Sequence, residues 1–172
     1  MAEQPWPGLL RLSELARGPA KRRVVAGEEV RKELARRLGL DGLDRLEAEV
    51  EATPWLDGAK LRGRFDALVR QTCGVTLEPL ESRLEGDFDL KILPAGSPNA
   101  PAEPEEMVLD PEAEDPPDLI EGAEIDLGAL VVEQLALEID PFPRKPGAEF
   151  DPGPQEQPAS PFAVLKDFKP KG

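Results

Sequence analysis

The most apolar run of the chain lies between Ile125 and Asp140. Apolar residues recur there at every fourth position, which is the spacing of one face of an α-helix. This stripe consists of Leu127, Val131, Leu135 and Ile139, widened by Leu130 and Leu137. Asp126 precedes it and can accept an amide proton of the first turn, so we expect the helix to begin there. Pro141 and Pro143 follow, and the helix cannot continue past Asp140.

A second helix is predicted from Glu28 to Leu38. Its apolar stripe consists of Val30, Leu34 and Leu38. Gly39 stands where a helix favours a glycine just beyond its C-terminus. Two acid–base pairs at a spacing of four residues support the helix, and they are Glu28–Lys32 and Glu33–Arg37.

Three segments between the two helices alternate apolar and charged residues instead. They cover residues 46–52, 60–70 and 83–92. Consecutive runs with a period of two are typical of an antiparallel sheet with one solvated face. Asp57-Gly58 predicts the first turn between them. Two shorter apolar segments, Trp6–Leu12 and Arg22–Val25, are further strand candidates, and the loop between them contains Gly18-Pro19.

These elements predict an α+β protein. Its mainly antiparallel sheet is packed by two or three helices, and partial closure of the sheet into a barrel is left open. The helix at 28–38 and the helix after Asp126 are the candidates for covering the inner side of the sheet.

Composition limits how much of the chain belongs to this domain. The 172 residues include 20 Pro and 15 Gly, too many for compact structure throughout. We expect a β-rich part with one helix at 1–93, a disordered acidic Pro-rich linker at 94–118, a helix and Pro-rich arm completing the same domain at 119–150, and a flexible tail at 151–172. No segment is apolar over about 20 residues, so a cytoplasmic protein without membrane contact is expected.

The charge is unevenly distributed along the chain. Residues 1–95 carry 16 Lys and Arg against 17 Asp and Glu, whereas residues 96–172 carry 5 against 18. An acidic surface repels phosphate backbones and favours basic partners. The alternative, that the acidic segment only keeps the chain in solution, stays open.

The residue chemistry offers little for catalysis. The chain has one cysteine and no histidine, which excludes Cys–His activation of a nucleophile and the usual zinc sites. Cys73 is therefore expected to be a small buried apolar group. The acidic residues between 110 and 118 lack the spacing of a calcium loop. We expect no catalytic residue, no metal, no cofactor and no small-molecule substrate, and a metal-dependent nuclease is the least favoured alternative.

One sheet strand carries a row of basic residues, which are Lys60, Arg62, Arg64 and Arg70. Such a row can follow a nucleic-acid backbone. However, the neighbouring strands present acidic residues at matching positions, and opposite charges across a sheet stabilise pairing by about 0.2–1 kcal/mol. Pairing within the sheet is the favoured interpretation, and direct RNA binding through this row is the alternative.

Two other segments are candidates for partner binding. The first joins two strands and spans residues 71–80, and the second is the stiff, basic and aromatic arm at 140–147. Proline lowers the entropy cost of docking such an arm. The alternative for the arm is a strap along the sheet. The predicted partner-binding residues are Gln71, Thr72, Cys73, Thr76, Glu78, Phe142, Arg144 and Lys145.

These two segments also carry a resemblance to a known family. The chain resembles the YceD family of large ribosomal RNA subunit accumulation proteins, in its alphaproteobacterial form. The resemblance lies in an ordered set of motifs, which are residues 71–80, Asp115–Asp118, Ile125–Gly128, Glu133–Leu137 and residues 140–147. The resemblance covers about residues 10–150. Many family members have further cysteines near the position of Cys73, so no thiol or metal role carries over to this chain.

The resemblance implies a non-enzymatic factor of ribosome biogenesis that supports accumulation or processing of large-subunit ribosomal RNA. Its implied partners are the large-subunit ribosomal precursor, a basic ribosomal protein or ribosomal RNA. The alternative function is an acidic adaptor or holdase for basic protein clients unrelated to ribosomes.

Overall fold

The computed structural model describes residues 2–101 and 115–149. The predicted tail and residues 102–114 of the predicted linker lie outside these ranges. The described elements are, in chain order, β1 (Ala2–Pro5), β2 (Leu9–Arg11), the 3-10 helix η1 (Leu12–Arg17), β3 (Ala20–Val25), α1 (Glu28–Leu38), β4 (Gly42–Trp55), β5 (Gly58–Thr72), β6 (Pro79–Pro94), β7 (Asp118–Ile120), β8 (Glu124–Asp126) and α2 (Leu127–Glu138).

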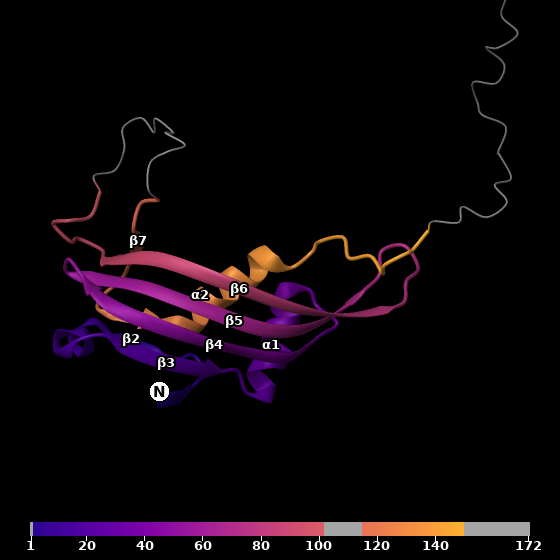
Figure 1. The fold of residues 1–172 in the computed structure, drawn as a ribbon, viewed down its shortest axis with the longest axis horizontal. Coiled ribbons are helices and arrows are strands. Elements are labelled where there is room, and N and C mark those ends of the chain that lie inside the picture. The colour runs from indigo at the N-terminus through magenta and orange to yellow at the C-terminus, as the bar shows by residue number, and fades with distance from the viewer. Residues whose placement is uncertain (1, 102–114, 150–172) are drawn as a thin grey trace, which may run out of the picture.

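Six strands form one open sheet in the order β1-β3-β4-β5-β6-β7 (Figure 1). The four strands from β3 to β6 are antiparallel, while β1 and β7 are added in parallel at the two edges. The predicted α+β class with a mainly antiparallel sheet is confirmed. The described strands form no closed barrel, since β1 and β7 end the sheet on opposite sides.

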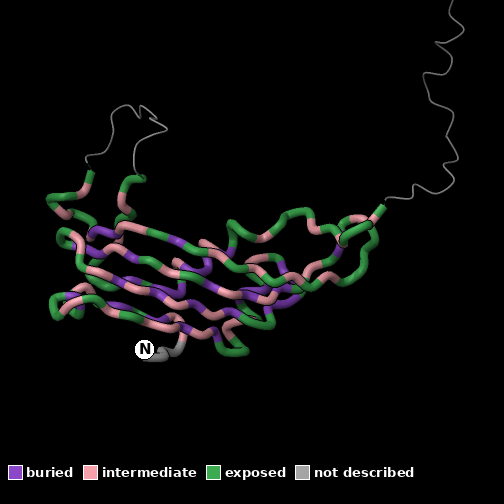
Figure 2. Tube along the Cα trace, in the orientation of Figure 1, coloured by how far each residue is buried: buried purple, intermediate pink, exposed green. Residues whose placement is uncertain are grey.

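The three alternating segments lie within the long strands β4, β5 and β6, as predicted. Leu61, Phe65 and Val69 of β5 are buried on one face, which we call the inner face. Phe88 of β6 is buried there too, while Leu84 is half-buried. Charged residues occupy the alternate positions on the outer face. The alternation of burial along these strands is visible in Figure 2.

Helix α2 packs against β5 and β6 and begins as predicted. The Asp126 carboxylate accepts the N–H of Ala129 at 2.8 Å. Leu127, Val131 and Leu135 are fully buried. The prediction that Leu137 widens this buried stripe is wrong, because its side chain is 78% exposed.

The buried face of α2 instead includes Gly128 and Val132. The N-terminal segment packs against this side of the helix, and Gly128 donates to the Pro7 carbonyl at 2.7 Å. A Cβ atom on Gly128 would lie only 2.7 Å from the Trp6 ring. Trp6 and Pro7 therefore cover the side of α2 that carries Gly128. Leu137 lies nine residues further on, which is the opposite side of the helix.

Helix α1 packs on β4 and has its predicted bounds. Gly39 follows it with a φ of +69°, a left-handed conformation that favours glycine. The predicted Glu28–Lys32 ion pair is present at 2.8 Å. The predicted Glu33–Arg37 pair is wrong, since Glu33 pairs with Arg36, one helical turn away on the i,i+3 spacing.

The N-terminal region differs most from the sequence expectation. Only residues 9–11 of the predicted strand Trp6–Leu12 are extended, and they pair with β8 in a separate two-stranded sheet. The next residues form η1, which no periodicity indicated, and Leu15 is buried from it. The predicted strand Arg22–Val25 is confirmed within β3.

The turn between β4 and β5 is displaced by one residue from the predicted Asp57-Gly58. Leu56 and Asp57 form the turn, and Leu56 has a φ of +52°. Gly58 is already the first residue of β5. Asp57 also accepts hydrogen bonds from Ser97 and Asn99 at 2.8 and 2.9 Å, so this turn holds the chain after β6.

Gly58 is the glycine that the packing here tolerates least. A Cβ atom at this position would lie 1.9 Å from the Ile92 carbonyl oxygen of β6. We expect Gly58→Ala to lower the free energy of unfolding by about 2 kcal/mol or more, because backbone has to shift. Urea unfolding measures this. Gly74→Ala is the matched control, since its nearest neighbour would be 3.8 Å away. Equal stability of the two variants would contradict the prediction.

Candidate functional site

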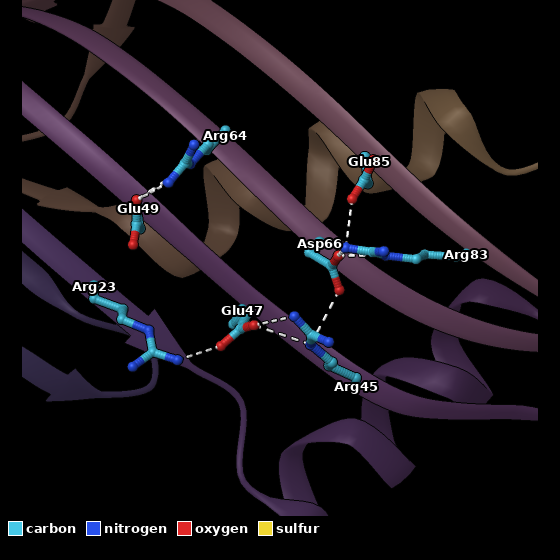
Figure 3. A network of polar contacts seen from close by, with 8 residues as sticks. All are labelled: Arg23, Arg45, Glu47, Glu49, Arg64, Asp66, Arg83 and Glu85. Atoms are coloured by element: carbon cyan, nitrogen blue, oxygen red, sulfur yellow. Dashed lines mark hydrogen bonds and ion pairs between the residues drawn. The ribbon is translucent and has the colours of Figure 1, made fainter.

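The outer face of the sheet carries a network of alternating charges (Figure 3). Six side chains from four neighbouring strands belong to one connected chain: Arg23, Glu47, Arg45, Asp66, Arg83 and Glu85. Arg23 contacts Glu47 at 2.5 Å, and Arg45 contacts both Glu47 at 2.9 Å and Asp66 at 3.0 Å. The hydrogen bond from Arg23, followed by that from Arg45, lowers the pKa of Glu47.

The predicted basic row of β5 is part of the same pattern. Arg64 pairs with Glu49 of β4 at 2.6 Å, and Arg62 pairs with Asp89 of β6 at 2.9 Å. Lys60 also contacts Asp89, at 3.3 Å, and Arg70 contacts Asp44 at 2.8 Å. The hydrogen bond from Arg62 lowers the pKa of Asp89. The favoured interpretation of this row, pairing within the sheet, is therefore what the structure shows.

A second site lies at one end of the sheet, where two segments far apart in the sequence meet. Residues 73–78 connect β5 to β6, and residues 140–147 follow α2; together they form what we call the tip (Figure 1). Gly74 donates its N–H to the Pro143 carbonyl at 2.9 Å. The Lys145 ammonium contacts Glu78 at 2.9 Å, and the hydrogen bond from Lys145 lowers the pKa of Glu78. The two segments predicted separately for partner binding thus form one surface.

Cys73 lies at the centre of the tip and is fully buried. Its sulfur accepts the N–H of Thr76 at 3.5 Å and the N–H of Lys145 at 3.4 Å. Hydrogen bonds from the Thr76 side chain and then from the N–H groups of Thr76, Lys145 and Val75 lower the pKa of the Cys73 thiol to about 6. The sulfur consequently joins the loop to the arm through hydrogen bonds from both.

The loop itself closes through its backbone. Cys73 donates to the Glu78 carbonyl, and Leu77 donates to the Cys73 carbonyl, each at 2.9 Å. Leu77 has a φ of +59° and is 77% exposed. Sequence analysis missed Leu77, because a single leucine in a turn carries no periodic signal.

The predicted partner-binding residues divide into two groups by what they contact. Five of the exposed or half-buried ones have partners inside the protein. Gln71 donates to the Asp140 carbonyl and Thr72 donates to Asp41. Thr76 and Lys145 both donate to the fifth, Glu78. Phe142 is 77% exposed, and Arg144 is exposed as well. They alternate along the arm with Pro143 and Lys145, which contact the loop. The tip therefore presents Leu77, Phe142 and Arg144 outward.

Two further kinds of site are absent from the described residues. They contain no group of three or more Cys, Asp or Glu side chains placed to hold a metal ion. None of their helices combines the length and the apolar character needed to cross a membrane.

Comparison with known proteins identifies the family. The family model described as large ribosomal RNA subunit accumulation protein YceD matches residues 61–169. The chain belongs to the YceD family. No curated protein and no solved structure matches the chain. The family match begins at Leu61, so it leaves residues 10–60 of the resemblance seen in the sequence without support.

The YceD match covers both segments of the tip. It spans nearly all of β5, then β6, β7, β8 and α2, whereas β1 to β4 and α1 precede it. The elements shared with the family are thus those that position residues 73–78 and 140–147. The name of the family supports a role in ribosome biogenesis.

The charged network permits a comparison of two acidic residues. The Asp66 side chain is 15% exposed and contacts two arginines, Arg45 and Arg83, whereas Glu49 is 39% exposed and, among the described residues, pairs only with Arg64. We expect Asp66→Ala to lower the free energy of unfolding by about 1.5–3 kcal/mol, and Glu49→Ala by less than about 1 kcal/mol. Urea unfolding at moderate salt measures both. A larger loss for Glu49→Ala would contradict a central role of Asp66 in the network.

The lowered pKa of Cys73 predicts a pH dependence of stability. The pKa of the thiol is about 6 in the folded protein and about 8.5 in the unfolded chain. Its stabilising contribution is therefore complete above about pH 8.5, declines as the pH falls, and is lost below the folded value. We expect the difference in unfolding free energy between the natural protein and Cys73→Ala to increase from about pH 5 to about pH 9. A constant difference would show that the thiol stays protonated.

Proposed function

We propose that this protein is a non-enzymatic factor in biogenesis of the large ribosomal subunit, and that it contacts the precursor particle through the tip. The family match over residues 61–169 is the observation that carries this proposal. It includes the complete tip. The order of the motifs further supports an alphaproteobacterial-type member that acts in the bacterial cytoplasm.

The surface chemistry of the tip is suited to protein or ribonucleoprotein contact. Phe142 offers an exposed aromatic group, a type enriched in interfaces, and Leu77 adds exposed apolar surface. Arg144, two residues along the arm, adds a planar cation that can bind carboxylate or phosphate with two hydrogen bonds. A hydrogen bond from the loop to Pro143 and one from Lys145 to the loop hold the arm in place, which reduces the entropy lost on binding.

Charge favours a basic ribosomal protein over bare RNA as the primary contact. The chain has a net charge of −14, and the basic row of the sheet is neutralised by its neighbours. Phosphate backbones would meet few unpaired cations on the outer face. A basic protein would be attracted instead.

A sucrose gradient of a cell lysate tests the proposal. Each fraction is probed for this protein and for precursor ribosomal RNA, and we expect both in the fractions of the large-subunit precursor. The variant Phe142→Ala with Arg144→Glu should shift most of the protein to the top of the gradient. A reduction of about tenfold or more is expected, since loss of an interface anchor costs about 2 kcal/mol.

The control variant combines Leu119→Ala with Arg17→Glu, because both residues are exposed and lie toward the end of the sheet opposite the tip. It should sediment like the natural protein. Natural protein found only at the top, with normal ribosomal RNA in a deletion strain, would contradict the function and favour the acidic adaptor. Undiminished sedimentation of the tip variant would contradict only the assignment of the tip.

A further inference from the structure

Strand β6 has a long side without a neighbouring strand. It runs from Pro79 to Pro94, but β7 pairs with it only at Ile92, Leu93 and Pro94. On the same side, no described strand pairs with residues 79–91, which we call the open edge. Figure 1 shows β6 as the last long strand of the sheet, with β7 beside one of its ends.

The open edge leaves backbone groups available for a further ladder. In an antiparallel pair, alternate residues direct their N–H and C=O groups away from the partner strand. No other described backbone segment hydrogen-bonds to the residues between Leu80 and Lys91 on this side. Such an edge is a template for another extended chain.

The outer side of the open edge is acidic. Its charged residues are four acids and two bases: Glu81, Arg83, Glu85, Asp87, Asp89 and Lys91. Glu85 and Asp89 pair with arginines of the sheet, but Glu81 and Asp87 have no ion-pair partner in the described part of the chain. Basic side chains on an added strand would lie directly beside these two carboxylates, where opposite charges stabilise strand pairing.

The inner side of the same edge is apolar. Leu84 and Leu90 are only half-buried, and they alternate with the charged residues. Helix α2 packs on β6 and covers this side in part. An added strand would place every second side chain against these leucines, so apolar residues fit there.

We propose that the open edge of β6 binds an extended segment of a basic protein as an additional strand, in which basic and apolar residues alternate. This inference rests on the proposed function and names its partner as a protein rather than an RNA. RNA cannot continue a backbone ladder. Pairing of two β6 edges from two copies would bring together two edges with a net negative charge, which disfavours a dimer.

A labelled synthetic peptide of alternating lysine and valine, about as long as the open edge, tests the proposal on the full-length protein. Two matched peptides serve as controls. One is N-methylated at every second residue and cannot form the ladder, and the other has glutamate in place of lysine. We expect the lysine peptide to bind at least about tenfold more tightly than either control and to protect from hydrogen exchange the alternate amides of residues 79–91 that point away from β5.

Two protein variants separate local charge from net charge. Glu81→Lys with Asp87→Lys should weaken binding of the lysine peptide by about tenfold. Glu29→Lys with Glu33→Lys changes the net charge equally on the exposed side of α1. It should change the affinity by less than about twofold, since charges beyond about 8 Å are screened at physiological salt.

Several outcomes would overturn the proposal. Equal binding of the lysine and N-methylated peptides would show charge attraction without a ladder. If the amides of this edge that point away from β5 are already protected in the free protein, with no peptide bound, another part of the chain or a second copy occupies the edge, and sedimentation equilibrium distinguishes these. A polyuridylate that displaces the peptide from the same amides would identify RNA as the ligand. None of these results depends on the gradient experiment, so the edge and the proposed function can fail separately.

Discussion

β5 and β6 pair without interruption from Ala59 opposite Ile92 to Thr72 opposite Pro79. Two aromatic rings on glycines fix this register. Phe88 lies over Gly63, where a Cβ atom would be 2.2 Å from the ring, and Phe65 lies over Gly86 in the same way, at 2.5 Å. Displacing the pairing by one residue would turn every charged side chain of one strand inward. The outer network, the tip and the open edge all depend on this one register.

The register also explains how a strongly acidic chain holds a sheet with so many arginines. Each cation of β5 meets an acid on β4 or β6, so the charges stabilise the outer face without a ligand. Glu81 and Asp87 have no ion-pair partner among the described residues, because β6 has no long neighbouring strand beyond it. The same arrangement that neutralises the middle of the sheet thus leaves its last long strand acidic.

Sequence patterns correctly predicted the strands and helix ends that depend on residues close together in the chain. Period-two alternation indicated three long strands, and Asp126 and Gly39 indicated helix ends, because each depends on residues near in sequence. The tip could not be predicted as one site. Its two segments lie about 70 residues apart and meet through backbone hydrogen bonds to Pro143 and from Lys145, which leave no residue pattern. Leu77 and Leu137 were missed or misplaced for the same reason, since tertiary packing decides their exposure.

The tip and the open edge are continuous along the chain, because the loop ends at Glu78 and β6 begins at Pro79. A partner bound at one is therefore held close to the other. The second contact is then intramolecular, so two weak contacts give a tighter complex than either alone. In the proposed complex Leu77 and Phe142 would supply apolar contact at the tip, while Glu81 and Asp87 would select basic side chains beside it. For the proposed partner, specificity for a basic protein would come from the combination of the two surfaces and not from the acidity of the chain alone.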